Sequence, residues 1–192
     1  MAELLMALLV SSIILGAVAS LASALDCANA QTAQMGRRQA ALRFTTVRIC
    51  ELVKQSKRIF SLPTAGVGLW TGDANDDGLI NASELVYIEP DGSGQSLQLL
   101  EFPGQGQSVS ISDIEAGTAR DDFVATGNER VTVLLADCTN IQFTVNGSKF
   151  VNIAFDLTEN NITSHYQICA TMISSSDNLI GPGGALVSGD DD

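Results

Sequence analysis

The sequence predicts an α+β fold in which one long N-terminal α-helix, about residues 2–60, packs on an antiparallel β-sheet. Residues 4–25 form an unbroken apolar run. No proline precedes Pro63, and apolar residues continue beyond the run at the spacing of an amphipathic helix. After Pro63 the pattern changes to short segments of alternating apolar and polar residues, which is typical of strands with one buried face.

The composition is that of a folded chain. Of the 192 residues, 45% are hydrophobic and 17% are charged, whereas disordered chains combine low hydrophobicity with high charge. The length suits one globular domain with a long appendage. The formal net charge is −12, so we expect no nucleic-acid partner, because such binding depends on lysine and arginine side chains at phosphates.

The charge is divided unevenly along the chain. Residues 1–62 carry seven basic and three acidic side chains, whereas residues 63–192 carry three basic and 19 acidic ones. In an assembly, this asymmetry allows the helix of one subunit to attract the acidic domain of another. The alternative is an acidic surface that only keeps the domain soluble. Cations are the expected partners of the acidic part.

The apolar run is long enough to cross a membrane. Residues 4–25 contain no charge and no proline, and as a helix they span roughly 33 Å, compared with about 30 Å for the core of a bilayer. A cleaved signal peptide usually has basic residues before a shorter apolar core, whereas the only charged residue before this run is Glu3. We therefore expect a retained helix.

Three regions are predicted. Residues 1–26 are the hydrophobic part of the helix, residues 27–62 are its amphipathic half, and residues 63–192 are a globular β-rich domain. We expect residues 61–72 to form a linker or loop, with Pro63 ending the helix. The apolar stripe on the second half of the helix predicts that this half packs on the domain.

The start of the chain resembles that of type IV pilins and pseudopilins. Glu3 is a lone glutamate, the apolar residues LLMALLV follow at positions 4–10, and an amphipathic half-helix then leads into a β-rich domain. The resemblance implies a precursor anchored in the inner membrane, trimmed by a prepilin peptidase and polymerised with copies of itself into an extracellular helical filament. A major pilin, a minor pilin and a type II secretion pseudopilin remain open.

The resemblance also implies a role for Glu3 in assembly. Its carboxylate would neutralise the N-terminal amine of a neighbouring subunit. Physical reasoning supports a cationic partner, because a carboxylate at the mouth of an apolar helix bundle is costly unless it is paired. The alternative is an ordinary signal-anchor helix on an unrelated exported protein.

The domain is expected to contain a series of short strands. These lie at residues 85–89, 96–102, 131–137, 141–145, 150–157 and 166–173. Asn146-Gly147 predicts a type I′ hairpin turn. Residues 101–127, rich in Gly, Ser and Asp, are expected to form a long surface loop, and residues 181–192 a flexible or strand-edge tail.

Residues 73–84, DANDDGLINASE, match the calcium-loop motif D-x-[DN]-x-[DN]-G followed by E. The expected ligands are the side chains of Asp73, Asn75, Asp77, Asn81 and Glu84 and the backbone carbonyl of Leu79. Ile80 should point into the core. The loop resembles an EF-hand, but no second hand follows it. We therefore expect bound calcium to stabilise the fold rather than to act as a sensor or switch. The alternative is a polar turn that binds no ion.

Four cysteines in an exported chain suggest disulfides. They are Cys27, Cys50, Cys138 and Cys169. Cys27 and Cys50 lie roughly 34 Å apart on a helix, and bridged Cα atoms lie within about 7 Å, so these two cannot pair within one chain. If all four pair within one subunit, each helix cysteine bonds a sheet cysteine. Alternatively, Cys27 bridges subunits or stays free, because the two helix cysteines point about 140° apart.

No catalytic pattern is found, and we expect a structural protein rather than an enzyme. His165 is the single histidine, and we expect it on the surface at the start of a strand. Asp121 and Asp122 are adjacent carboxylates in an expected loop. Two alternatives to a filament subunit remain, which are a membrane-anchored calcium-dependent binding module that does not polymerise and an anchored hydrolase.

Overall fold

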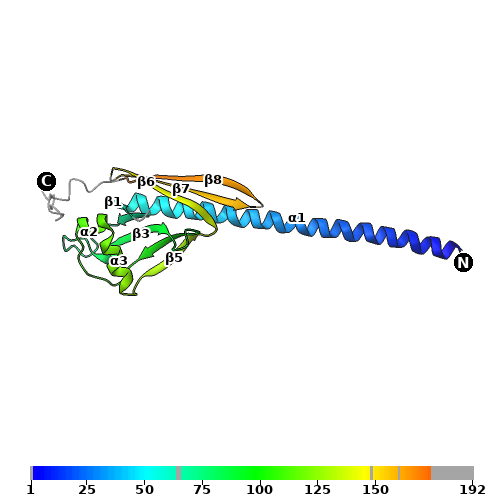
Figure 1. The fold of residues 1–192 in the computed structure, drawn as a ribbon, viewed down its shortest axis with the longest axis horizontal. Helices are drawn as coiled ribbons and strands as arrows, with labels where there is room; N and C mark the ends of the chain where they lie inside the picture. Colours follow the sequence, from blue (N-terminus) through cyan, green and yellow to red (C-terminus); the bar gives the residue numbers. More distant parts are fainter. Residues whose placement is uncertain (1, 64–65, 148, 160, 174–192) are drawn as a thin grey trace. The chain divides into compact units, whose positions relative to one another are not determined.

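The computed structural model describes residues 2–63, 66–147, 149–159 and 161–173. The expected α+β class is confirmed, because helix α1 (Ala2–Gln55) precedes two antiparallel sheets of five and three strands (Figure 1). The chain divides into two compact units, Met1–Arg43 and Phe44–Asp192. The tail expected at residues 181–192 lies outside the described residues.

Helix α1 ends at Gln55, earlier than the expected residue 60. The N–H group of Ser56 still donates to the carbonyl of Leu52 at 3.0 Å, but the next one, of Lys57, donates to Trp70 at 2.7 Å. Cross-strand pairing therefore replaces the helical ladder before Pro63 is reached.

The linker expected at residues 61–72 was a wrong prediction. The chain instead forms a hairpin of β1 (Arg58–Leu62) and β2 (Gly66–Trp70). All five residues of β2 are buried, so this strand lacks the alternation of apolar and polar residues that marks a half-exposed strand. Its two glycines and its length made it look like a loop.

The five-stranded sheet is an antiparallel meander in the order β1-β2-β3-β4-β5. Its remaining strands are β3 (Leu85–Pro90), β4 (Leu97–Glu101) and β5 (Arg130–Leu135), which confirms three of the expected strands. The residues of β2 and nearly all of β3 are buried. Because side chains alternate between the two faces of a strand, both faces of the sheet are covered at β2 and β3, whereas the first four residues of β5 are exposed.

Two short helices cover one face of the sheet, and they lie in the segment that was expected to be a loop. Helix α2 (Ile111–Ala116) and helix α3 (Thr118–Ala125) occupy much of residues 101–127, as Figure 1 shows. They bury Ile114 and Phe123 in a cluster of strand residues. That cluster includes Phe60, Leu62, Trp70, Leu85, Tyr87, Leu100 and Phe102.

The last turns of α1 belong to the same unit as the sheets. Ile49, Leu52 and Val53 are buried there, and the hydroxyl of Thr45 donates to the carbonyl of Leu134 on β5. The expected packing of the amphipathic half of the helix on a sheet is therefore confirmed for residues 44–55.

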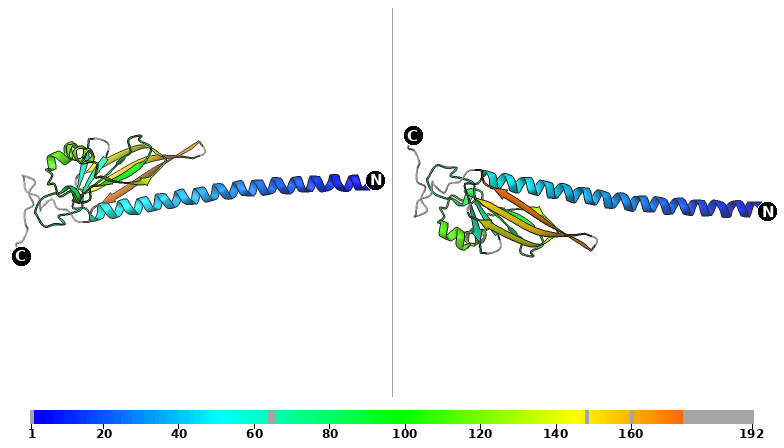
Figure 2. Two further views of the ribbon diagram at one scale, coloured as in Figure 1. Left: turned by 90° about the horizontal axis from the view of Figure 1, so that it is seen from below. Right: turned by 90° about the horizontal axis from the view of Figure 1, so that it is seen from above.

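The three-stranded sheet contains β6 (Cys138–Asn146), β7 (Phe150–Glu159) and β8 (Ile162–Thr171), and Figure 2 shows its strands side by side. These strands were expected. The type I′ turn was not correctly placed, because Asn146 is still part of β6 and pairs with Phe150. The inner face buries Val151, Ile153 and Phe155.

Candidate cation-binding loop and exposed helix

The predicted calcium loop, residues 73–84, joins β2 to β3. A short 3₁₀ helix, η1 (Ala82–Glu84), ends it. The neck of the loop is closed by Thr71, whose N–H and hydroxyl groups donate to the carbonyl of Glu84 at 3.0 and 2.9 Å. The loop therefore begins and ends at neighbouring points on two paired strands.

Asp73 organises the first half of the loop. Its carboxylate accepts the N–H group of Asp77 at 3.2 Å and that of Gly78 at 2.8 Å. Gly78 has φ 74° and Asp76 has φ 55°, which lie in the left-handed region that glycine adopts at low cost. This conformation explains why the motif requires glycine at residue 78.

Asp77 lies at the centre of the loop. Its Oδ1 accepts the N–H group of Leu79 at 2.8 Å. Its Oδ2 accepts two side-chain amides, from Asn75 and from Asn81, both at 2.8 Å. The hydrogen bond from Asn81, followed by that from the Leu79 N–H group, holds the pKa of Asp77 below its usual value. The carboxylate is thus kept ionised by neutral donors.

Asn81 has a buried acceptor that is not satisfied. The residue is 1% exposed, and its Oδ1 has no hydrogen-bond partner among the residues that the structure describes. Asn81 caps η1 opposite Glu84, and the N–H group of Glu84 donates to the backbone carbonyl of Asn81 at 3.0 Å. A buried carbonyl oxygen without a partner is costly.

Glu84 is buried and bound by N–H groups from three parts of the chain. Its Oε1 accepts from Ala74 at 2.7 Å, and its Oε2 accepts from Asn81 at 3.1 Å and from the indole of Trp70 at 3.4 Å. The Glu84 carboxylate therefore connects residues near both ends of the loop, Ala74 and Asn81, with the buried Trp70. Its expected role as a bidentate ligand stays a prediction.

The donor groups of the loop suit a hard cation. Over the described ranges, no three Asp, Glu, His or Cys side chains gather as a metal-binding group. The side-chain oxygens that the loop brings near one another belong to the Asp77 carboxylate and to the amides of Asn75 and Asn81 bound to it, and the Asp73 carboxylate is tied to the same residue through the Asp77 N–H group. Calcium takes such carboxylate, amide and carbonyl oxygens, and the orphaned Oδ1 of Asn81 is an acceptor that an ion would satisfy.

The loop is anchored to the core as expected. Ile80 is 2% exposed and packs in the cluster beneath α2 and α3. Leu79, next to it, is 46% exposed. The chain therefore changes from exposed at Leu79, the expected carbonyl ligand, to buried at Ile80. The expected ligand Asn81 follows directly.

The N-terminal half of α1 exposes its apolar side chains within this chain. Each of the following is between 52 and 70% exposed: Met6, Leu8, Leu9, Val10, Ile13, Ile14, Leu15, Val18, Leu21 and Leu25. Glu3 is also exposed. By length and composition, one helix of the described chain is apolar enough to cross a membrane. The partner predicted for Glu3 belongs to another subunit, so a single chain does not test it.

The four cysteines are free. Cys138 is buried, with its thiol directed at the carbonyl of Leu135, whereas Cys169 is exposed, with its thiol near Asn152. The two sheet cysteines thus lie on opposite faces of the three-stranded sheet. The structure forms none of the suggested intrachain disulfides among the described residues.

Two polar networks were not predicted. Asp156 accepts Asn140 Nδ2 at 2.7 Å and pairs with His165 across the ladder of β7 and β8. The bond from Asn140, followed by that from His165, lowers the pKa of Asp156. The exposed position expected for His165 is correct, since its side chain is 82% exposed.

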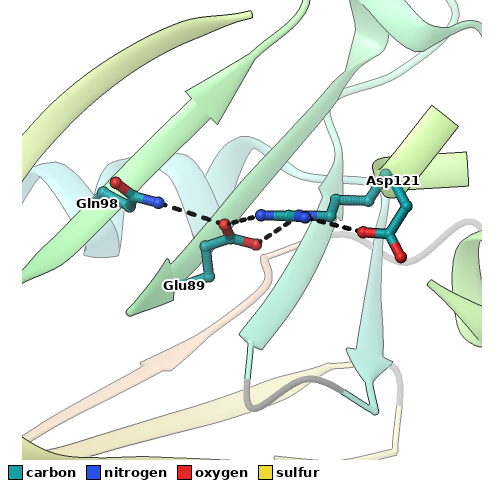
Figure 3. A network of polar contacts seen from close by, with 4 residues as sticks. Glu89, Gln98 and Asp121 are labelled. Carbon is teal, nitrogen blue, oxygen red and sulfur yellow. Dashed lines mark hydrogen bonds and ion pairs between the residues drawn. The ribbon is translucent and has the colours of Figure 1, made fainter. Parts of the chain in front are cut away.

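The second network joins α3 to the sheet. Glu89 on β3 is bound by the guanidinium of Arg120, whose Nε lies 3.0 Å from Glu89 Oε2. Gln98 donates to Glu89 at 3.3 Å, and Arg120 also donates to Asp121 at 2.8 Å (Figure 3). Asp121 therefore lies on a helix rather than in the expected loop, and it takes part in a structural ion pair.

Comparison with known proteins gives no match to this chain among protein-family models, curated proteins or solved structures.

Proposed function

We propose that this chain is a structural subunit of an extracellular filament of the type IV pilin class, polymerised through its N-terminal helix. The observation that carries the proposal is the exposure of every large apolar side chain between Met6 and Leu25. Soluble monomers rarely expose contiguous apolar surface of this extent. Lipid before assembly, and the helices of other copies after it, would cover these residues.

Glu3 supports assembly over simple anchoring. It is the only charged residue before the apolar run, and an unpaired carboxylate within an apolar bundle is strongly unfavourable. In a filament its carboxylate pairs with the N-terminal amine of a neighbouring subunit. A membrane anchor has no need of an acid at this position.

The distribution of charge supports lateral packing of subunits. Basic residues are concentrated on the helix at Arg37, Arg38, Arg43 and Arg48, and the remainder of the chain is strongly acidic. Opposite surface potentials orient partners and favour one register. Within the class, a major pilin, a minor pilin and a type II secretion pseudopilin share these features, and each fits the proposal.

Calcium in the loop of residues 73–84 is proposed as a stabiliser of the exposed domain. A cation that binds only the folded state stabilises it by roughly 2.7 kcal/mol at a hundredfold excess over its Kd. The loop connects two buried strands and carries Ile80 into the core. Bound calcium would therefore stabilise the fold as a whole, in a protein without disulfides among its described residues.

A second candidate is a membrane-anchored calcium-dependent binding module that does not polymerise. It is favoured by the membrane-spanning length of the apolar helix. Glu3→Ala separates the two candidates, with Asp26→Ala as a matched control because Asp26 is another exposed carboxylate on the same helix.

The measurement is electron microscopy of the source cell surface, together with surface labelling of the domain. If the chain is a filament subunit, Glu3→Ala abolishes filaments while the membrane-bound chain persists, and Asp26→Ala assembles normally. Wild-type cells that display the chain without filaments, or Glu3→Ala filaments of normal number, would show that the filament proposal is wrong.

A further inference from the structure

Asn81 belongs to the cation loop and also to a second element of the domain. Within the loop, its Nδ2 donates to Asp77 Oδ2 at 2.8 Å. Its backbone forms an isolated antiparallel bridge with Ser108. Ser108 lies in residues 103–110, here called the strap, which lead from β4 into α2. Asn81 is thus in contact with both the loop and the strap.

The strap is held to the loop by main-chain hydrogen bonds on both sides of Asn81. The N–H group of Val109 donates to the carbonyl of Ile80 at 2.8 Å, and that of Ala82 donates to the carbonyl of Gln107 at 3.0 Å. The strap then ends at Ser110, whose side chain caps α2. A change in the backbone at Asn81 therefore alters the support of the segment that enters this helix.

The side chain of Asn81 is unequally satisfied at its two ends. Its nitrogen is bound to Asp77, but its buried oxygen has no partner in the described part of the chain. A half-turn of the amide would direct that oxygen toward Asp77 Oδ2. Two oxygens facing each other repel unless a positive charge lies between them, so neither orientation is favourable without a cation.

Asn75 provides a comparison at the same carboxylate. It donates to the same Oδ2 of Asp77 at the same distance, 2.8 Å. Asn75 is exposed, however, and its Oδ1 accepts the N–H group of Asp77 at 3.3 Å. Its amide oxygen is therefore satisfied with or without an ion, and it has no bond to the strap that the structure describes.

We propose that Asn81 transmits cation occupancy of the loop to the strap. With a divalent cation in the loop, the amide turns its oxygen to the ion, and the buried acceptor is satisfied. The backbone bridge to Ser108 is then held in place, and the strap is protected. This inference rests on the part of the proposed function in which the loop binds calcium, but it does not depend on filament assembly.

The test uses the full chain in detergent micelles, with Ca²⁺ or with a chelator. Binding is followed by the fluorescence of Trp70, the single tryptophan, whose indole lies 3.4 Å from Glu84 Oε2. Hydrogen exchange of residues 103–110 reports on the strap. In the wild type, Ca²⁺ is expected to change the fluorescence and to slow exchange in the strap about tenfold or more, which corresponds to stabilisation of the local opening equilibrium.

Asn81→Asp and Asn75→Asp form a matched pair. Each adds a carboxylate beside Asp77, and each is expected to tighten Ca²⁺ binding about tenfold, because ligand charge sets the affinity of such loops. Without Ca²⁺, Asn81→Asp is expected to speed exchange of the strap and lower the Tm by about 2–4 °C, because its charge is buried. Asn75→Asp, which is exposed, leaves the strap unchanged.

The outcomes separate the two proposals. If Ca²⁺ changes neither the Trp70 fluorescence nor the exchange of the wild type, the loop binds no calcium and this inference also fails. If Ca²⁺ binds but the strap exchanges equally in both conditions, or if Asn81→Asp behaves like Asn75→Asp, the inference about Asn81 is wrong and the calcium loop stands.

Discussion

The buried carboxylate of Glu89 on β3 is paired with Arg120 on α3. Glu89 is 4% exposed, and a buried charge is tolerated only when it is paired and hydrogen-bonded. Arg120 and Gln98 supply those bonds. The side chain of Arg120 is itself 25% exposed, so water and Asp121 solvate its outer part. The pair therefore joins α3 to β3 while only Glu89 is deeply buried.

Arg120→Ala is expected to destabilise the fold by about 2–3 kcal/mol, less than for a fully buried pair, because it leaves the Glu89 carboxylate buried without its cation. Arg120→Ala/Glu89→Gln should recover part of that loss, since the uncompensated charge is removed. Arg130→Ala is the control, because Arg130 is 66% exposed and lies 3.9 Å from Glu101; it should cost less than about 0.5–1 kcal/mol. Chemical denaturation of the full chain measures all three, and equal effects for Arg120 and Arg130 would contradict this account.

The residues that sequence alone located are those whose partners are close along the chain. The motif at residues 73–84 places Asp73, Asp77 and Asn81 in one loop because twelve consecutive positions determine its geometry. Glu89 and Arg120 are 31 positions apart, and their pairing depends on how α3 folds over the sheet. The same holds for Asp156 and His165, which meet only through the register of β7 and β8.

At the scale of elements, α2 and α3 show where the sequence pattern was too short to interpret. They span six and eight residues, and segments of this length contain too few turns for helical periodicity to emerge. Their Ser and Gly residues are caps, because Ser110 accepts the N–H group of Asp113 and Gly117 adopts φ 80°. Residues that favour loops by composition therefore delimit two helices.

Gly117→Ala is expected to destabilise the domain by about 1 kcal/mol or more. Gly117 ends α2 and precedes α3 in the left-handed region, which is unfavourable for residues with a Cβ. An added Cβ would lie 3.5 Å from Pro63, an ordinary contact, so the cost is one of backbone conformation. Gly106→Ala is the control, since its Cβ would meet nothing within 4 Å. Thermal unfolding compares the two, and an unchanged Tm for Gly117→Ala would contradict the assigned conformation.

Strands and helix ends were also predicted correctly where a local sequence pattern determines them, and were missed where contacts with distant residues determine them. β7 was predicted because Val151, Ile153 and Phe155 alternate in the sequence with Asn152, Ala154 and Asp156, and the structure buries the first three. β2 was missed because both of its faces are buried, which depends on the helices and strands that cover it. The end of α1 at Gln55 is likewise set by the pairing of Lys57 with Trp70, a contact that local helix propensity does not contain.

At the scale of the whole molecule, the two halves of α1 have opposite relations to solvent. Residues 44–55 bury Ile49, Leu52 and Val53 in their own unit, whereas the large apolar side chains from Met6 to Leu25 are exposed. The stability of the domain therefore depends on the second half of the helix, and the proposed association with lipid or other copies would depend on the first half. A substitution in the exposed part should change association without changing the fold.

Leu15→Lys tests this separation. Leu15 is 70% exposed, so the substitution removes no packing within the chain, and unfolding of the domain should shift by less than about 0.5 kcal/mol. A lysine near the middle of an apolar helix costs about 2.5–3.5 kcal/mol in a membrane. We expect release of the variant from membranes on alkaline extraction and loss of filaments. Ala28→Lys, beyond the apolar run, should retain both. A Leu15→Lys chain that stays membrane-bound and assembles normally would contradict the role of the apolar helix, as would a wild-type chain that is a dispersed monomer in detergent-free buffer.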